Sequence, residues 1–175
     1  MDKLEEELIA GYEEDGETAE FCDPWLDRPE DLDKLAKSPR KQVREVVASI
    51  GRPKDLELLV NDPEASVRRE VAEWGRDRDL DRLVNDPSEN VREEVARHGR
   101  DKDLDILVHD ESPDIRWMVA FSDKDKYLDI LVNDPDWEVR KAVAMAGRDK
   151  DLDKLETDEN KWVREEVARQ RRLKL

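Results

Sequence analysis

The chain has 175 residues, of which 46% are charged and 5% are aromatic, and its formal net charge is −16. Its 48 acidic and 32 basic side chains argue against direct binding of DNA or RNA, because affinity for phosphates comes from clustered Lys and Arg. Cys22, the single cysteine, excludes an intrachain disulfide and a cysteine-based metal cluster. Without an apolar run long enough to span a membrane, and without a signal peptide at the N-terminus, we expect a cytoplasmic protein.

Residues 1–30 form an acidic segment that we expect to cap the rest of the chain. They carry a net charge of −10, from twelve acidic and two basic side chains. An amphipathic helix is predicted by four apolar residues at helical spacing: Leu4, Leu8, Ile9 and Tyr12. We expect Gly11 and the acidic stretch 13–20 to end it. A second, degenerate helix is predicted around Asp23-Pro24 by Phe21, Trp25 and Leu26.

From residue 31 onward, one 24-residue pattern recurs without a gap. The six repeats are 31–54, 55–78, 79–102, 103–126, 127–150 and 151–175. Positions 2 and 5 are Leu in every copy, position 13 is Val or Ile, position 14 is Arg, and positions 17 and 18 are Val-Ala. Such a period predicts an all-α fold, an α-solenoid in which six two-helix repeats stack superhelically behind the N-terminal cap.

Each repeat is predicted to hold two helices. The first, of about eight residues ending at position 7, presents the Leu residues of positions 2 and 5 on one face. Asp-Pro at positions 8 and 9 is expected to start the second helix, with Asp accepting from free N–H groups and Pro at the first helical position. The second helix should end near position 20, before a left-handed glycine at position 21: Gly51, Gly75, Gly99 and Gly147.

The motif Asp-Pro-x-x-x-Val-Arg-x-x-Val-Ala, preceded by Leu-x-x-Leu, resembles two related repeat families over residues 31–175. The Asp-to-Arg spacing is similar to HEAT repeats, especially the short HEAT-like repeats of phycobilisome lyases, and the 24-residue length is closer to the leucine-rich repeat variant. Both resemblances imply scaffolds and binding surfaces. An iron–sulfur segment known in the variant family does not carry over, because Cys22 stands alone.

An arginine occupies position 14 of every repeat, and we expect it to be structural rather than a ladder for phosphates. The column is Arg44, Arg68, Arg92, Arg116, Arg140 and Arg164. Each guanidinium is predicted to pair with the Asp at position 8 of its own or the adjacent repeat, in the bidentate geometry that suits a carboxylate. Ser38 takes the place of that Asp in the first repeat.

No arrangement of residues in the chain predicts catalysis. His98 and His109 lie in different repeats without a second ligand at helical spacing, and neither is followed by Glu. Ser–His–Asp and Cys–His arrangements, phosphate loops and metal-ligand spacings are absent. We therefore expect a protein that is not an enzyme and holds no cofactor or metal.

Repeats four and five depart from the pattern at outward positions of their second helices. Trp117, Phe121, Trp137 and Met145, here named the aromatic patch, occupy positions 11, 15 and 19, where other repeats have charged or small residues. Exposed clusters of this kind mark interfaces, whereas a curved stack or an adjoining loop would instead bury them. Trp74 and Trp162 occur singly and are expected to be packing residues.

The sequence therefore predicts a protein-binding scaffold or adaptor whose partner docks on repeats four and five. One alternative is an acidic mimic of nucleic acid that occupies the groove of a nucleic-acid-binding protein, which the charge of residues 1–30 favours. Another, implied only by the family resemblance, is a lyase or chromophore-handling protein.

Overall fold

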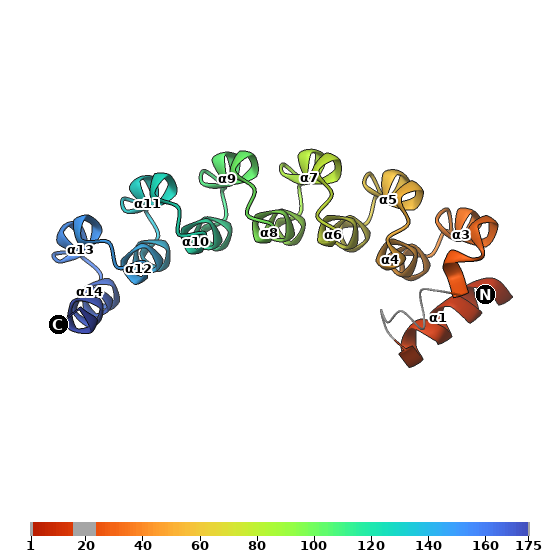
Figure 1. Ribbon diagram of the computed structural model, residues 1–175, viewed down its shortest axis with the longest axis horizontal. Helices are drawn as coiled ribbons and strands as arrows, with labels where there is room; N and C mark the ends of the chain where they lie inside the picture. The colour runs from red at the N-terminus through yellow and green to blue at the C-terminus, as the bar shows by residue number, and fades with distance from the viewer. Residues whose placement is uncertain (1, 16–23, 175) are drawn as a thin grey trace. The chain divides into compact units, whose positions relative to one another are not determined.

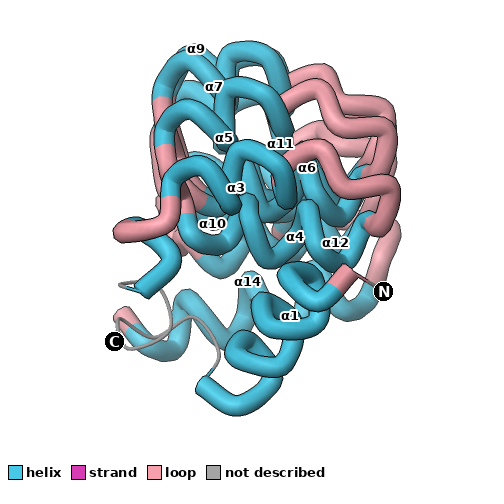
Figure 2. The backbone as a smooth tube through the Cα atoms, turned by 90° about the vertical axis from the view of Figure 1, so that its right-hand side faces the viewer, coloured by secondary structure: helices cyan, strands magenta, loops and turns pink. Residues whose placement is uncertain are grey.

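The computed structural model describes residues 2–15 and 24–174, which form helices joined by turns, with no strand in these ranges (Figures 1 and 2). Helix α1 covers Lys3–Asp15. The first helices of the repeats are α3 (Pro29–Leu35), α5 (Pro53–Leu59), α7 (Asp77–Leu83), α9 (Asp101–Leu107), α11 (Asp125–Leu131) and α13 (Asp149–Leu155). The second helices are α4 (Lys41–Ile50), α6 (Ala65–Glu73), α8 (Glu89–Arg97), α10 (Pro113–Phe121), α12 (Trp137–Met145) and α14 (Lys161–Leu173).

The chain divides into two compact units, Met1–Val95 and Ala96–Leu175. In the first unit α4 packs on α6, and in the second α10 packs on α12 and α12 on α14. Helices α4, α6, α10, α12 and α14 also pack on the first helix of their own repeat, as α10 does on α9. Within each unit the first helices thus form one row and the second helices another, which is the α-solenoid arrangement that the period predicts (Figure 1).

The repeated apolar positions build the core between the two rows. In the second repeat Leu56 and Leu59 from α5 meet Val67 and Val71 from α6, and all four are at most 2% exposed. The equivalent residues of the other repeats are buried in the same way. Burying a Leu or Val side chain contributes roughly 1.5–3 kcal/mol, so four such positions per repeat supply most of the driving force for stacking.

The first helix has seven residues and begins before the repeat to which it was assigned. It runs from position 23 of the preceding repeat to position 5 of its own repeat. The first of these helices, α3, accordingly begins at Pro29, inside the segment assigned to the cap. Proline at the start of α3 and α5 favours this boundary, since it lacks the N–H that a first turn leaves unpaired.

The second helix begins at position 11, and the prediction that Asp-Pro supplies its first residues is wrong. Asp62 Oδ1 accepts from the backbone N–H of Glu64 at 2.9 Å, and the Asp residues of later repeats do the same with the residue at position 10. Asp and Pro therefore build a turn that precedes the helix, and position 10 is the N-cap.

In the first five repeats the second helix ends before position 21, as predicted, whereas α14 of the sixth repeat continues through Arg171 to Leu173. Gly51, Gly75, Gly99 and Gly147 have φ between 63° and 76°. In the fourth repeat Asp123 takes this place with φ 53°, the positive value that Asp tolerates better than most residues.

Helix α1 continues through Gly11 to Asp15, so Gly11 does not end it. A glycine inside a helix costs about 1 kcal/mol, but α1 packs against α3 and α4 and buries Leu8 completely, which outweighs that cost. Residues 24–26 form a short helical turn in which Trp25 is buried and Leu26 is exposed. Phe21 and Cys22 lie outside the described residues.

The cap also explains why Ser38 replaces Asp in the first repeat. Its hydroxyl donates to Glu5 Oε1 at 2.5 Å and accepts from the backbone N–H of Arg40 at 3.1 Å. The serine thus keeps the turn that Asp makes elsewhere. An Asp here would place a second carboxylate against the buried Glu5.

Candidate functional site

The aromatic patch lies on α10 and α12, neighbouring second helices of the Ala96–Leu175 unit. Trp117 is 39% exposed, Phe121 51% and Met145 40%, so the structure does not bury these three side chains. Trp137, the first residue of α12, is half-buried. The expectation that neighbouring helices or loops cover the patch therefore fails for three of its four members.

Two contacts bring members of the patch together. Trp117 and Phe121, one helical turn apart on α10, have ring centroids 4.2 Å apart with planes tilted by 39°. Phe121 and Met145 line a hollow of ≈ 270 Å³ between α10 and α12. Neither Trp117 nor Trp137 lines this hollow.

Small side chains on both helices create the hollow. Its other lining residues are Ala120, Asp123, Ala142 and Ala146. Position 16, where Ala142 lies, is Glu in three of the other repeats, and those side chains would fill the space. Asp123, in left-handed conformation, closes the end of the hollow where α10 stops. A surface of rings and methyl groups around a concavity suits an apolar anchor from a partner.

The arginine column is structural, as predicted, and most of its members link their own repeat to the next one. The side chains of Arg44, Arg68, Arg116 and Arg140 are 10–13% exposed, and each makes a bidentate pair with the Asp eighteen residues ahead. Arg140 Nε lies 2.7 Å from Asp158 Oδ2 and its Nη2 3.0 Å from Oδ1. The remaining nitrogen, Nη1, donates to the carbonyl of Asp134 at 2.8 Å.

This geometry fixes the charge state of the pair. The hydrogen bond from Arg140 holds the pKa of Asp158 below its ordinary value, although burial acts in the opposite direction. Arg164, in the last repeat, donates to the carbonyls of Asp158 and Glu159. Because these guanidinium groups are occupied by protein oxygens, they do not form a row of free cations for phosphate.

A second network of ion pairs was not predicted from the sequence, although its signal, Arg-x-x-Asp across four of the five repeat junctions, is visible there. Arg52 Nε donates to Asp55 Oδ2 at 2.7 Å and Nη1 donates to the carbonyl of Pro29 on the preceding first helix. This pairing of an Arg with the Asp three residues ahead is here named the clasp. It also joins Arg28 to Asp31, Arg76 to Asp79, Arg100 to Asp103 and Arg148 to Asp151. The junction between repeats is therefore held on both rows of helices.

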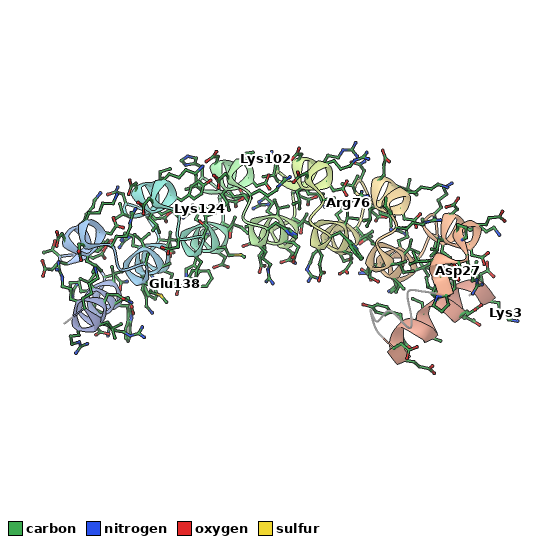
Figure 3. The ribbon with its side chains drawn as sticks, viewed as in Figure 1. Lys3, Asp27, Arg76, Lys102, Lys124 and Glu138 are labelled. Carbon is green, nitrogen blue, oxygen red and sulfur yellow. The ribbon has the colours of Figure 1, made fainter. Side chains whose placement is uncertain are left out.

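The junction between the fourth and fifth repeats changes both partners of this clasp at once. Lys124 stands for Arg and donates to the carbonyl of Gly99 at 2.7 Å. Tyr127 stands for Asp, and its hydroxyl lies 2.8 Å from the carbonyl of Asp101 and 3.0 Å from Asp105 Oδ1. The tyrosine thus replaces the guanidinium's contact to the preceding first helix. Figure 3 shows Lys124 on the side of the first helices and Glu138 on the opposite side, beyond α12.

The two single tryptophans differ in their surroundings. Trp74 packs over Gly51, where an added Cβ would lie 2.1 Å from the indole ring, and its Nε1–H donates to the carbonyl of Ala48 at 2.9 Å. One face of this ring remains open, since Trp74 is 49% exposed. Trp162 is 47% exposed, with the Lys161 ammonium 4.4 Å from its ring centre.

Within residues 2–15 and 24–174, no three His, Cys, Asp or Glu side chains form a group that could hold a metal ion. Among the described helices, none combines the length and the apolar character needed to cross a bilayer.

No protein-family model matches the chain, and no curated protein matches it. Among solved structures, it is similar to a designed armadillo repeat protein in complex with the peptide (KR)4, with 14% identity, 87% of this chain and 85% of that chain covered, and a TM-score of 0.36. It is also similar to a computationally designed armadillo repeat protein for modular peptide recognition (14% identity, 87% and 85% covered, TM-score 0.35) and to an engineered protein (15%, 97% and 97%, 0.33). Similarity this low supports no conclusion about function. The chain is a helical repeat protein on the grounds of its own period and helix pairs.

Proposed function

We propose that this chain is a non-enzymatic protein-binding scaffold or adaptor, and that its partner docks on the aromatic patch of α10 and α12. The observation that supports the proposal is the exposure of Phe121 and Met145 at a hollow, with the exposed Trp117 ring stacked on Phe121. The other second helices of the chain have charged or small residues at the same positions. Side chains of this size on a charged surface are favoured only if something covers them.

The expected energetics follow from the geometry of the hollow. An apolar side chain of the partner would sit between Phe121 and Met145 and lie against the Trp117 ring. Truncating an aromatic anchor at an interface centre commonly costs about 2 kcal/mol or more, whereas the surrounding charged rim contributes little. Trp137, half-buried at the start of α12, would contact the edge of the same partner.

The test is a variant that removes both exposed rings of α10. Trp117→Ala with Phe121→Ser should leave helicity and melting temperature nearly unchanged, because these rings are exposed, and should weaken partner binding by about tenfold or more. The partner would be captured from a lysate on the immobilised wild-type chain, identified, and titrated by calorimetry. Trp162→Ala is the matched control, since it removes an equally exposed indole outside the patch. A large drop in melting temperature, or an unchanged dissociation constant, would show that the patch does not bind the partner.

A second candidate, the acidic mimic of nucleic acid, is favoured by the net charge of −16. It makes a different prediction, because binding through rows of carboxylates weakens steeply with added salt and is competed by DNA or RNA. Binding through the aromatic patch should change little between low and moderate salt.

A further inference from the structure

The Met1–Val95 unit carries a second concave surface, far from the aromatic patch in sequence. A groove of ≈ 440 Å³ lies between α1, α4 and α6. Its apolar lining comes from Ile9, Tyr12 and Val46, and its acidic lining from Glu13, Glu45 and Glu70. Because α1 has no counterpart in the repeats, this groove is a product of the cap rather than of the repeat pattern.

The floor of the groove is apolar because of one departure from the repeat. Position 16 is Glu in the second, third and sixth repeats but Val46 in the first, where it is 4% exposed. Ile9 and Tyr12 from α1 are half-buried beside it. A fully hydrated ion would gain nothing from this floor, so the groove favours a ligand with an apolar side chain.

Two carboxylates of the lining are available for a cationic ligand. Glu13 and Glu45 form no ion pair with any residue that the structure describes, whereas Glu70 is already engaged by Arg69 at 3.2 Å. Glu70 also lines an adjoining hollow of ≈ 200 Å³, together with Ser49, Glu73 and the open face of Trp74. Apolar and acidic surface thus continues from α1 along the exposed side of α4 and α6.

We propose that this groove binds a basic segment of a partner protein in which an apolar side chain is flanked by Lys or Arg. The apolar side chain would lie on Val46, Ile9 and Tyr12, and the flanking cations against Glu13 and Glu45. Carboxylates on the rim repel acidic peptides, phosphates and anionic lipid headgroups, which leaves a cationic peptide as the complementary occupant. The proposal uses no residue of the aromatic patch, so either binding surface can fail without the other.

The test uses three fluorescein-labelled peptides and measures anisotropy at about 50 mM salt, where exposed charges are only partly screened. Lys-Arg-Leu-Lys-Leu-Arg-Lys should bind saturably. Replacing both Leu by Ser should weaken binding by about fivefold or more, because the floor is left uncovered, and Glu-Asp-Leu-Glu-Leu-Asp-Glu should not bind.

Matched variants locate the site. Glu13→Gln with Glu45→Gln should weaken binding of the Leu-containing basic peptide by about fivefold or more, while Glu138→Gln with Glu165→Gln, which changes the net charge equally on α12 and α14, should have no effect. Trp117→Ala with Phe121→Ser should also bind this peptide normally. Equal weakening by both Glu pairs would mean unspecific attraction to a protein of charge −16, and no weakening by either would mean that the peptide binds elsewhere.

The chain contains its own basic and apolar segment at 171–174, where Leu173 is 70% exposed. If a second copy occupies the groove with this segment, size-exclusion chromatography will show concentration-dependent association that Leu173→Ser abolishes. That result would overturn the proposal of a separate partner.

Discussion

Each arginine of the column contributes more than one ion pair, because it connects three places in the chain. Arg140 donates two hydrogen bonds to Asp158 and one to the carbonyl of Asp134, and its side chain is 10% exposed. Exposed pairs contribute little to stability, but removing one partner of a buried pair leaves the other without its hydrogen bonds. The column therefore stabilises the fold, and removing one of its arginines should lower the free energy of unfolding.

Arg140→Ala should lower the free energy of unfolding by about 1–3 kcal/mol, since Asp158 and the Asp134 carbonyl lose their donor. Urea unfolding followed by circular dichroism measures this. Arg164→Ala is the control, because Arg164 donates only to carbonyls among the described residues and is exposed, and it should cost less. Partner binding by folded Arg140→Ala should equal that of the wild type.

Unchanged stability together with lost binding would mean that the arginine column contacts the partner instead of stabilising the fold.

The same pair should make stability depend on pH in a defined direction. The pKa of Asp158 is lowered in the folded state by Arg140, so the pair stabilises the fold above the ordinary Asp pKa of about 3.9. This contribution is lost as pH falls through the lowered folded-state pKa. In Arg140→Ala the Asp158 carboxyl carbon should titrate at higher pH in NMR spectra, and the stability difference from wild type should shrink toward pH 2. A stability difference that stays constant down to pH 2 would contradict this origin.

At the scale of the helix, the sequence predicted which residues are buried better than where helices begin. The buried faces follow from Leu at positions 2 and 5 and Val at 13 and 17, which recur in every copy. The start of the second helix could not be predicted from Asp-Pro, because this pair favours a turn as strongly as a helix start. In the second repeat Asp62 makes such a turn by accepting from the N–H of Glu64. The prediction that the N-terminal helix ends at Gly11 was wrong, because packing of α1 on its neighbours outweighs the low helix propensity of glycine.

The candidate site was predictable in part, because the repeat pattern shows which positions face outward. Large apolar residues at outward positions of α10 were visible in the sequence, and Trp117 and Phe121 are exposed there. The hollow between Phe121 and Met145 depends on Ala142 and Ala146 of the neighbouring helix, whose distance to α10 no periodicity gives. The groove of α1 was missed because it forms between the cap and two repeats, elements that no shared pattern connects.

The exchanged clasp between the fourth and fifth repeats predicts coupling between Lys124 and Tyr127. Tyr127→Asp should destabilise the chain, since the buried ring leaves a cavity and the Asp101 carbonyl loses a donor. Adding Lys124→Arg should recover part of the loss, because it restores the Arg–Asp pair found at Arg100 and Asp103. The double-mutant cycle should give a coupling of about 0.5–3 kcal/mol from urea unfolding. If the free-energy changes of the two single variants simply add, Lys124 and Tyr127 do not act as a coupled replacement for the Arg–Asp clasp.

At the scale of the whole molecule, recurring junctions make several of the repeats similar units. The junctions after the first, second and fifth repeats use the same contacts, an Arg at position 14 with the next Asp on one row and a clasp on the other, over the same Leu and Val positions. The chain departs from this rule between the fourth and fifth repeats, where Lys124 and Tyr127 replace the clasp, and at the cap, where Ser38 and Glu5 join it to the first repeat. Stability in such an array is a sum over repeats and their nearest-neighbour interfaces.

Removing one whole repeat should therefore preserve the fold. Deletion of 55–78 joins Lys54 to Asp79 within a first helix of unchanged pattern, and Arg44 and Arg52 then meet Asp86 and Asp79 in place of Asp62 and Asp55. Helicity per residue should stay within about 10% of the full chain, with a lower melting temperature because one interface is lost. Deletion of 67–78 removes half as many residues but takes away all of α6 except its first two residues, together with the first two residues of α7. The rest of α7 would then follow α5 with no second helix between them, so cooperative unfolding should disappear although the deletion is smaller. Circular dichroism melts compare the two chains. If the 24-residue deletion unfolds as completely as the 12-residue one, the junctions are not equivalent, and stability depends on contacts specific to the second repeat, such as Trp74 over Gly51.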